Sequence, residues 1–235
     1  MFSKSAKFYN TIYESMGKDY IAEARKVHQF VQKHKHAAGN SLLEVACGTG
    51  LHASALQEFY QVEGLDLDDE MLAVASQNYP DVTFHQADMA EFDLGKGFDA
   101  ITCLFSSIGY VKTKKHLEKA IQNMTRHLLA GGVLIVEPWF TPGQWQVGRV
   151  DALFVDQPDL KISRMSLGGV KGRLSILTFH YMVGTPKGIE YFTERHELGL
   201  FTHEEYLEAF RKTGLEITHD PEGVDGRGLY IGLKT

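Results

Sequence analysis

The stretch LLEVACGTG, residues 42–50, decides the fold of this chain. Apolar residues lead into Gly48 and Gly50, and a segment with helical spacing follows at 52–59. A buried strand that ends in glycines and continues into a helix lets a ligand approach the backbone, because no side chain blocks it. The pattern differs from a dinucleotide fingerprint, which needs a third glycine where this chain has Ala53. It also differs from a P-loop, which needs Gly-Lys-Ser/Thr.

Strands and helices alternate after this stretch. We expect strands at 42–46, 62–67, 82–85, 98–105 and 133–136, and helices at 52–59, 70–78, 114–129 and 202–213. The last helix opens with a Thr202 cap and has Glu205 three residues further on. The segment 98–105 is apolar almost throughout, which is typical of a strand covered on both faces. Closing strands are expected at 215–219 and 229–233. This order predicts an α/β fold with a Rossmann-like, mostly parallel sheet and helices on both faces.

A different pattern occupies residues 149–200. The segments LKISRMSL, GRLSILTFHYMV and GIEYFTERHELGL alternate apolar and polar residues, and glycine-containing turns separate them. They predict a small antiparallel β insert of three strands, placed after the fifth strand of the sheet. Helical spacing dominates residues 5–36, with Gly17 as a break. We therefore expect an N-terminal helical cap over 1–36, a core domain over 37–148 and 201–235, and the β insert over 149–200.

Composition excludes several classes of function. The chain has 235 residues, 24 Lys and Arg against 30 Asp and Glu, and a formal net charge of −6. A nucleic-acid partner is not expected, because binding it needs a basic stripe. No segment has the length of a membrane span, and the N-terminus has no apolar signal core. Cys47 and Cys103 cannot form a disulfide framework, so the sequence indicates a cytoplasmic protein without a membrane partner.

The histidines of the 33–40 segment raise the question of a metal. His34 and His36 have no third ligand nearby in the sequence. A structural metal site needs about four ligands, so we favour a solvated loop there and expect no metal.

Acidic residues follow the second and third expected strands. Asp66 closes VEGLDL, and Asp88 follows the third strand in HQADM. The carboxyl ends of parallel strands meet at one edge of a sheet, beside the glycine turn. There Asp66 can accept both hydroxyls of a ribose, and Asp88 can accept from an adenine amino group while Met89 packs on the ring. The three strand ends together predict a nucleoside site.

The set EVACGTG, GLDL and QADM resembles the class I S-adenosylmethionine-dependent methyltransferases over roughly residues 40–140. The resemblance implies a seven-stranded sheet whose last strand is antiparallel. It also implies S-adenosyl-L-methionine as cofactor, with S-adenosyl-L-homocysteine as product. The cofactor-binding residues that it implies are Tyr20, Ala46, Gly48, Gly50, Asp66, Leu67, Met71, Asp88, Met89 and Phe105.

A closer resemblance covers most of the chain. GKDYIAEA, FSSIGYVKT, VEPWF and DGRGLYIGL are similar to segments of the N,N-dimethyltransferases of nucleotide-linked 3-amino-3,6-dideoxy sugars, such as the desosamine and mycaminose enzymes. This resemblance implies two successive methylations of the amine of a dTDP-sugar, and a homodimer formed through the β insert. It also implies that Tyr13 faces the sugar nucleotide, and that Ser106 faces the sulfonium and the acceptor.

Two tyrosines are the candidate catalytic residues. Methyl transfer is an in-line displacement, so the acceptor nitrogen must be neutral and aligned, and positioning supplies much of the rate. The hydroxyls of Tyr13 and Tyr110 can orient an amine, and their rings suit a sulfonium cation. Some relatives carry histidine at the position of Tyr110. An unperturbed tyrosine is protonated near neutral pH, which argues against a general base there.

Three further residues are candidates for substrate binding. Arg227 stands between two glycines and can bind a diphosphate through both arms of its guanidinium. Glu137 and Trp139 follow the fifth strand. Glu137 either steers a cationic amine or caps the loop, and Trp139 either lines the substrate pocket or packs between insert and sheet.

Other functions are compatible with the sequence. A related methyltransferase would use another small acceptor, such as an amino acid or a natural-product hydroxyl. A nicotinamide oxidoreductase has a similar sheet, although the missing third glycine disfavours it. A catalytically silent, cofactor-binding partner of another enzyme is the third alternative. The sequence favours an S-adenosylmethionine-dependent N-methyltransferase of a small amine, with a dTDP-3-amino-deoxyhexose as the expected acceptor.

Overall fold

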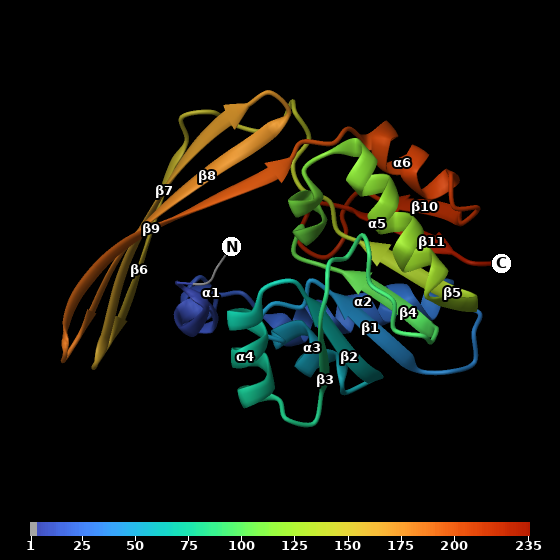
Figure 1. Ribbon diagram of the computed structural model, residues 1–235, viewed down its shortest axis with the longest axis horizontal. Helices are drawn as coiled ribbons and strands as arrows, with labels where there is room; N and C mark the ends of the chain where they lie inside the picture. Colours follow the sequence, from blue (N-terminus) through green and yellow to red (C-terminus); the bar gives the residue numbers. More distant parts are fainter. Residues whose placement is uncertain (1–3) are drawn as a thin grey trace.

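The computed structural model describes residues 4–235, which contain two sheets (Figure 1). The larger one, sheet A, has seven strands in the order β10-β11-β5-β4-β1-β2-β3. They are β1 (Ser41–Val45), β2 (Gln61–Asp66), β3 (Thr83–Gln86), β4 (Phe98–Cys103), β5 (Leu128–Val136), β10 (Glu216–Asp220) and β11 (Leu229–Leu233). The first five pair in parallel, and β11 is antiparallel to both of its neighbours. The predicted seven-stranded sheet with an antiparallel last strand is confirmed.

Helices cover both faces of sheet A. They are α2 (Tyr20–His34) and α3 (Leu51–Leu56) on one face, and α5 (Lys114–Arg126) and α6 (His203–Arg211) on the other, with α4 (Asp69–Asn78) beside β2 and β3. Successive residues of a strand point to opposite faces. Leu42 therefore packs with Val31 and Leu56, while Leu43 packs with Leu117 and Phe210. Within residues 4–235, no helix combines the length and apolar character needed to cross a membrane.

Two predicted helix ends are wrong. The helix expected at 52–59 ends at Leu56. The helix expected at 114–129 ends at Arg126, and Gly131 and Gly132 lie inside β5. Gly131 has a φ of 74°, and a Cβ there would lie 2.7 Å from the backbone nitrogen of Ala37. The glycines therefore do not end a helix. They allow the loop after α2 to pack directly against β5.

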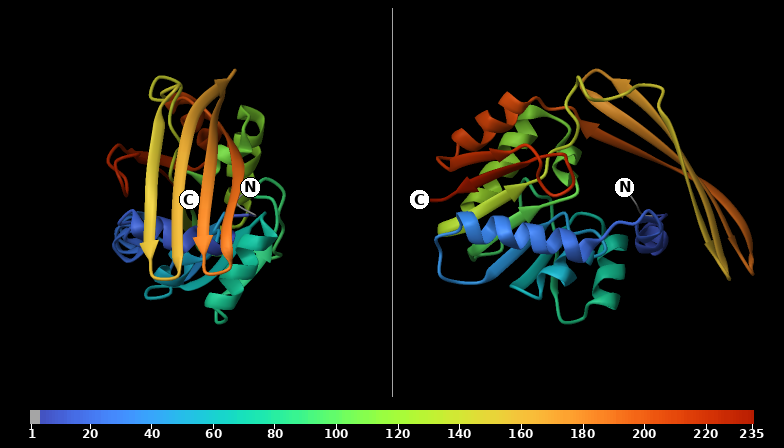
Figure 2. Two further views of the ribbon diagram at one scale, coloured as in Figure 1. Left: turned by 90° about the vertical axis from the view of Figure 1, so that its left-hand side faces the viewer. Right: turned by 180° about the vertical axis from the view of Figure 1, so that it is seen from behind.

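Sheet B is the predicted insert, and it has four strands rather than three. They are β6 (Val150–Gln157), β7 (Leu160–Lys171), β8 (Leu174–Thr185) and β9 (Gly188–Gly199), all antiparallel and in that order. Figure 2 shows them side by side, standing away from sheet A. The prediction omitted β6 because this strand is apolar on both faces. Its Phe154 is exposed and its Val155 buried, so no alternation marks it in the sequence.

The N-terminal segment divides between the two sheets. The 3₁₀ turn η1 (Ala6–Phe8) and helix α1 (Tyr9–Ser15) pack on one face of sheet B, which we call its inner face. There Phe8 and Ile12 join Val155 and Phe179 in one apolar cluster. Gly17, with a φ of 78°, separates α1 from α2, which packs on sheet A. The division of the chain at residues 36, 148 and 200 stays a prediction.

Candidate active site

The turn after β1 has a left-handed backbone at three residues. The φ angles are 59° at Ala46, 56° at Gly48 and 80° at Gly50. Glycine adopts this conformation freely, but other residues incur a cost of about 1–3 kcal/mol, so Ala46 is strained. A Cβ at Gly50 would lie 3.0 Å from the ring of Phe84, so the close packing of this turn requires glycine. The turn directs the backbone N–H of Gly48 toward the end of β2.

Asp66, the last residue of β2, receives that N–H. Its Oδ2 accepts from Gly48 N at 2.7 Å, and its Oδ1 accepts from Asp68 N at 2.9 Å. Burial raises the pKa of Asp66, although these two hydrogen bonds act in the opposite direction. Each carboxylate oxygen has a second lone pair, so Asp66 can still accept two hydroxyl protons from a ligand.

A cavity of 410 Å³, the donor cavity, lies at this edge of sheet A. Small-molecule sites have volumes of about 300–1,000 Å³, so a nucleoside fits. Seven of the predicted cofactor residues line it, namely Ala46, Gly48, Asp66, Leu67, Met71, Asp88 and Met89. Leu67 is apolar yet 51 % exposed, which suits a side chain that packs against a bound ring.

Three predicted cofactor residues lie outside this lining. Gly50 shapes the turn behind the cavity. Tyr20 is buried at the start of α2, with its ring edge-on to His52 at 4.7 Å, and its hydroxyl has no hydrogen-bond partner in the described part of the chain. Phe105 follows β4 and lines a second cavity. Their contacts with a cofactor stay predictions.

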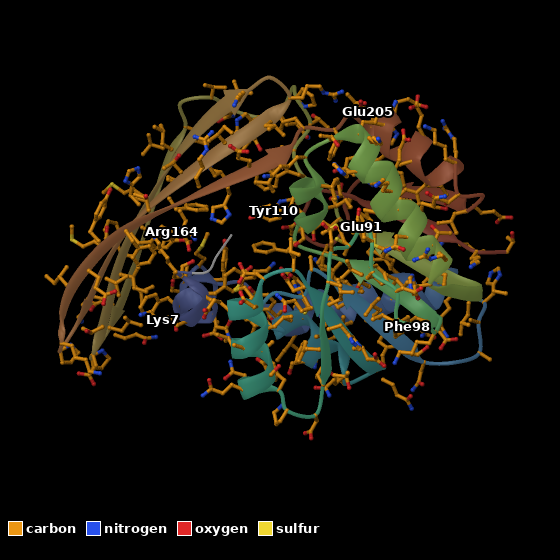
Figure 3. All side chains as sticks on the ribbon, in the orientation of Figure 1. Lys7, Glu91, Phe98, Tyr110, Arg164 and Glu205 are labelled. Carbon is orange, nitrogen blue, oxygen red and sulfur yellow. The ribbon has the colours of Figure 1, made fainter. Side chains whose placement is uncertain are left out.

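The second cavity, the acceptor cavity, has a volume of 530 Å³ and adjoins the first. Tyr9, Ser107 and Tyr110 line both cavities, so the two spaces meet at these residues. Its other walls include Tyr13, Phe105, Trp139, Trp145, Arg164, Phe179, His196 and Arg227. Figure 3 places Tyr110 and Arg164 on opposite sides, one on the body of the molecule and the other on sheet B.

Two of the predicted substrate residues lie behind the cavity wall. Ser106 is fully buried, and its hydroxyl donates to the carbonyl of Pro138 at 2.7 Å and accepts from Arg227 Nη1 at 3.0 Å. Glu137 accepts from the backbone N–H of Phe105 at 2.8 Å. Phe105 and Ser106 have left-handed φ angles of 52° and 59°, and these hydrogen bonds hold them there. Direct contact of Ser106 or Glu137 with the acceptor stays a prediction.

Glu137 has an unusual electrostatic environment. Burial and the nearby Asp225 carboxylate raise its pKa to about 7, although Arg227 favours the charged form. Its Oε1 lies 3.5 Å from Arg227 Nη1. Glu137 and Arg227 therefore lie side by side next to the acceptor cavity, and the net charge of the two changes near neutral pH because Glu137 gains or loses its proton there.

Tyr110 belongs to a buried chain of polar groups. Its hydroxyl lies 2.8 Å from Nδ1 of His196, and His196 Nε2 lies 3.9 Å from Glu194 Oε2. Burial opposes ionisation of Glu194, but hydrogen bonds from His196 and Ser5 lower its pKa overall. A charged Glu194 favours the tautomer with the proton on Nε2, so we assign Nδ1 as the acceptor of the Tyr110 proton. Burial raises the pKa of Tyr110 well above its usual range, which keeps this hydroxyl protonated.

A second chain of polar groups starts at Lys18 and Glu23, which line the acceptor cavity, and continues to the buried His52 and Glu44. Lys18 Nζ contacts Glu23 at 2.6 Å, Glu23 contacts His52 Nε2 at 2.7 Å, and His52 Nδ1 lies 3.6 Å from Glu44. Burial raises the pKa of Glu44 and lowers that of His52, which favours their neutral forms. Glu44 was missed by the sequence analysis, although an acid inside the apolar strand LLEV was a signal.

Sheet B and α1 contribute further residues that the sequence does not predict. Tyr9 lies one helical turn before Tyr13, and their ring centroids are 4.5 Å apart. Arg164 is a polar residue at a buried position of β7, and His196 at one of β9. The alternation of these strands marks both as inner-face residues, but only the folded chain brings them to Tyr110.

Comparison with known proteins assigns the class. A family model described as a methyltransferase domain matches residues 42–132. The dTDP-3-amino-3,6-dideoxy-alpha-D-glucopyranose N,N-dimethyltransferase of Streptomyces fradiae is 40% identical over 97% of this chain and 90% of the relative. The dTDP-3-amino-3,4,6-trideoxy-alpha-D-glucopyranose N,N-dimethyltransferase of Streptomyces venezuelae is 39% identical over 97% of each chain.

Solved structures agree. The crystal structure of Streptomyces venezuelae DesVI matches with a TM-score of 0.93 and 37% identity over 98% of each chain. The S-adenosylmethionine-bound structure of CalS10, an amino pentose methyltransferase from Micromonospora echinaspora, matches with a TM-score of 0.87 and 35% identity over 97% of each chain.

The fold, the glycine turn with Asp66 and these matches define a class I S-adenosylmethionine-dependent methyltransferase. Within this class, the chain belongs to the family of the dTDP-aminosugar N,N-dimethyltransferases. Its cofactor is S-adenosylmethionine, which the volume of the donor cavity and the free lone pairs of Asp66 accommodate. The alternative of a nicotinamide oxidoreductase is wrong.

Proposed function

We propose that this enzyme transfers two methyl groups, one after the other, to the amino group of a dTDP-linked 3-amino-3,6-dideoxyhexose. The observation that carries the proposal is the junction of a donor and an acceptor cavity at Tyr9, Ser107 and Tyr110. A nucleoside cofactor and a second, larger substrate can then meet at one point. The relatives described above are N,N-dimethyltransferases of dTDP-linked 3-amino sugars, so we take this class of compound as the second substrate.

The cofactor supplies a methyl group activated on a sulfonium, and the protein supplies alignment. Holding two reactants at near-attack distance can lower a barrier by about 7–11 kcal/mol. Tyr9 at the junction and Tyr13 in the acceptor cavity present neighbouring, tilted aromatic rings, which favour a cationic donor and orient the amine. Phe105, whose backbone is left-handed, forms the wall next to Tyr13. The two rings meet edge-on, with 5.1 Å between their centroids.

Tyr110 has the geometry to remove the proton that methylation leaves on nitrogen. Its hydroxyl proton points to His196, so an oxygen lone pair faces the cavity and accepts an N–H of the amine. When the N–C bond forms and the S–C bond breaks, the nitrogen becomes an ammonium. Its proton passes to Tyr110 Oη while the tyrosine proton passes to His196 Nδ1, and Glu194 stabilises the resulting imidazolium. The amine is then neutral again, as a second transfer requires.

A direct assay tests the acceptor. The purified enzyme is incubated with S-adenosylmethionine and, separately, with dTDP-3-amino-3,6-dideoxyglucose, its 4-amino isomer, the sugar without nucleotide, and free amino acids. Mass spectrometry is expected to show one and then two added methyl groups on the first compound. Faster methylation of the 4-amino isomer or of an amino acid would overturn the assignment of the acceptor.

We propose that the enzyme forms a homodimer through the outer face of sheet B. Seven large apolar side chains of this face are 50–75 % exposed, namely Val150, Phe154, Met165, Leu167, Met182, Ile189 and Tyr191. Phe154, Met182 and Tyr191 lie in one row across the sheet by strand register. An exposed apolar face of this size marks an interaction site, and a twofold axis would bring the same face of two copies together. Light scattering of Phe154→Asp with Met182→Asp is expected to give a folded monomer, and an unchanged mass contradicts the interface.

We propose a cytoplasmic location. Cys47 and Cys103 are both free and buried, which suits a reducing compartment. Fractionation of the producing cells tests this, and recovery from the culture medium contradicts it.

A further inference from the structure

Arg164 is a buried cation on the wall of the acceptor cavity. It lies on the inner face of β7, opposite Leu153 and Tyr181 by strand register, and is 8 % exposed. Its guanidinium carbon lies 5.4 Å from the ring centroid of Tyr13 and 4.7 Å from that of Phe179. The two rings hold the guanidinium at this place but satisfy none of its N–H groups.

Arg164 has no anionic partner in the described part of the chain. Among residues 4–235, no carboxylate oxygen lies within 4.0 Å of it, and its Nη1 is buried without a hydrogen-bond partner. Its Nη2 donates to the sulfur of Met16 at 3.6 Å. Burying a charge without a partner costs free energy. A bound anion would offset this cost by supplying the opposite charge.

Arg227, the residue that the sequence assigns to the diphosphate, has the opposite environment. It is bonded to Ser106 at 3.0 Å, and lies 3.5 Å from Glu137 and 3.7 Å from Asp225. The Asp225 carboxylate and the Glu137 side chain therefore already lie against its guanidinium. Arg227 is better placed to hold the loops that carry Ser106 and Glu137 than to attract a dianion.

We infer that Arg164 is the anion-binding residue of the acceptor cavity, and that it takes the diphosphate of the nucleotide-linked substrate. This inference rests on the proposed function. A guanidinium can bind two phosphate oxygens through parallel N–H bonds. Ser166, two residues further along the inner face of β7, lines the same cavity and offers a hydroxyl to the same group.

Calorimetry with dTDP and with inorganic pyrophosphate, without cofactor, tests the inference. Arg164→Gln is expected to weaken dTDP binding about 10- to 100-fold, the loss of a charged hydrogen-bond partner. Arg164→Lys keeps the positive charge but loses the paired N–H groups of the guanidinium. Its affinity for dTDP is expected to lie between those of Arg164→Gln and the wild type. Arg211→Gln, an exposed arginine on α6, is the matched control and is expected to bind as the wild type does.

Binding of S-adenosylhomocysteine reports whether each variant is folded, and it is expected to change less than twofold. Unchanged dTDP affinity in Arg164→Gln overturns the inference, even if the wild type methylates the aminosugar. Loss of dTDP affinity in a protein that methylates no aminosugar leaves Arg164 as the anion site and contradicts the proposed function instead. If Arg164→Gln does not fold, wild-type dTDP affinity in Arg164→Lys overturns the inference.

Discussion

Asp66 joins the end of β2 to the glycine turn, so its carboxylate acts on both structure and binding. Removal of this acceptor in Asp66→Ala is expected to weaken S-adenosylhomocysteine binding by about 1–3 kcal/mol, the scale of a lost charged hydrogen bond. Titration calorimetry measures the effect, with Asp159→Ala in an exposed turn as the control. Wild-type affinity in Asp66→Ala would show that this carboxylate does not hold the ribose.

Glu137 makes the stability of the enzyme depend on pH. Burial raises its pKa to about 7 in the folded protein, above the ordinary value of 4.5. The folded state therefore holds this proton more tightly, and the stability it contributes is lost as the pH rises from about 4.5 to about 7. In Glu137→Gln this loss is absent, so the stability of the wild type relative to the variant is expected to fall by roughly 1–3 kcal/mol across that window.

Urea unfolding at a series of pH values checks this expectation. Glu216→Gln, an exposed carboxyl on β10, is the control and keeps the wild-type pH profile. Parallel profiles for Glu137→Gln and the wild type would contradict the raised pKa of Glu137.

The hydrogen bond between Tyr110 and His196 predicts a specific kinetic defect. In His196→Asn, the side-chain amide can accept from the Tyr110 hydroxyl but cannot take its proton. We expect kcat to fall about 10- to 100-fold with little change in acceptor KM, and the monomethylated product to accumulate. Product analysis by mass spectrometry compares this variant with Tyr110→Phe and with His36→Asn, an exposed histidine. Fully dimethylated product at the wild-type rate would rule out the proton path.

At the residue scale, sequence reasoning works where the chemistry is local. Gly48, Asp66 and Met89 follow strand ends, and parallel topology alone brings strand ends together. The hydrogen bond from Tyr110 to His196 joins residues 86 positions apart, one in the 3₁₀ turn at Ser107–Val111 and the other in β9. The unpaired state of Arg164 depends on which carboxylates lie near it in space. Neither property can be derived from spacing in the chain.

Helix α6 connects the two sheets through its first turn. Thr202 and Glu205 form a capping box, with Thr202 Oγ1 accepting from Glu205 N at 3.3 Å and Glu205 Oε2 accepting from Thr202 N at 2.9 Å. Arg173, in the turn between β7 and β8, donates to Glu205 at 2.7 Å. Thr202→Ala is expected to lower the free energy of unfolding by about 1 kcal/mol. Thr202→Ser keeps the cap and is expected to stay near the wild type in urea denaturation; equal losses in both variants would contradict the capping role.

Among the elements, those with a continuous apolar run or a regular apolar period are predicted well. The order of β1 to β5 and the capped helix α6 follow from periodicity and from Thr202 with Glu205. β6 was not predicted, because Phe154 and Val155 place apolar groups on both of its faces. The end of α5 was misplaced, because Gly131 and Gly132 serve packing against the loop after α2 rather than helix termination. Such contacts between distant segments leave no local pattern.

In the whole molecule, the two cavities are lined largely by different parts of the chain. Residues around sheet A line the donor cavity, and sheet B adds many of the residues that line the acceptor cavity. Met71 on α4 belongs to the donor cavity, and Leu177 on sheet B to the acceptor cavity. Met71→Ala is expected to raise the dissociation constant of S-adenosylhomocysteine several-fold, and Leu177→Ala to raise the acceptor KM alone. Their effects are expected to add within about 0.5 kcal/mol in the double variant, as for separate sites. Strong non-additivity would show that the cavities behave as one space.

Each strand of sheet B contributes to two surfaces, because adjacent residues point to opposite faces of the sheet. Arg164 faces the cavity, and its neighbour Met165 faces outward and is 50 % exposed. A deletion of one residue early in β7 would exchange them, so that a thioether entered the cavity and a cation reached the apolar exterior. New acceptor specificities can therefore evolve by substitution at every second residue of this strand. An insertion or deletion within the strand would instead disrupt both of its faces.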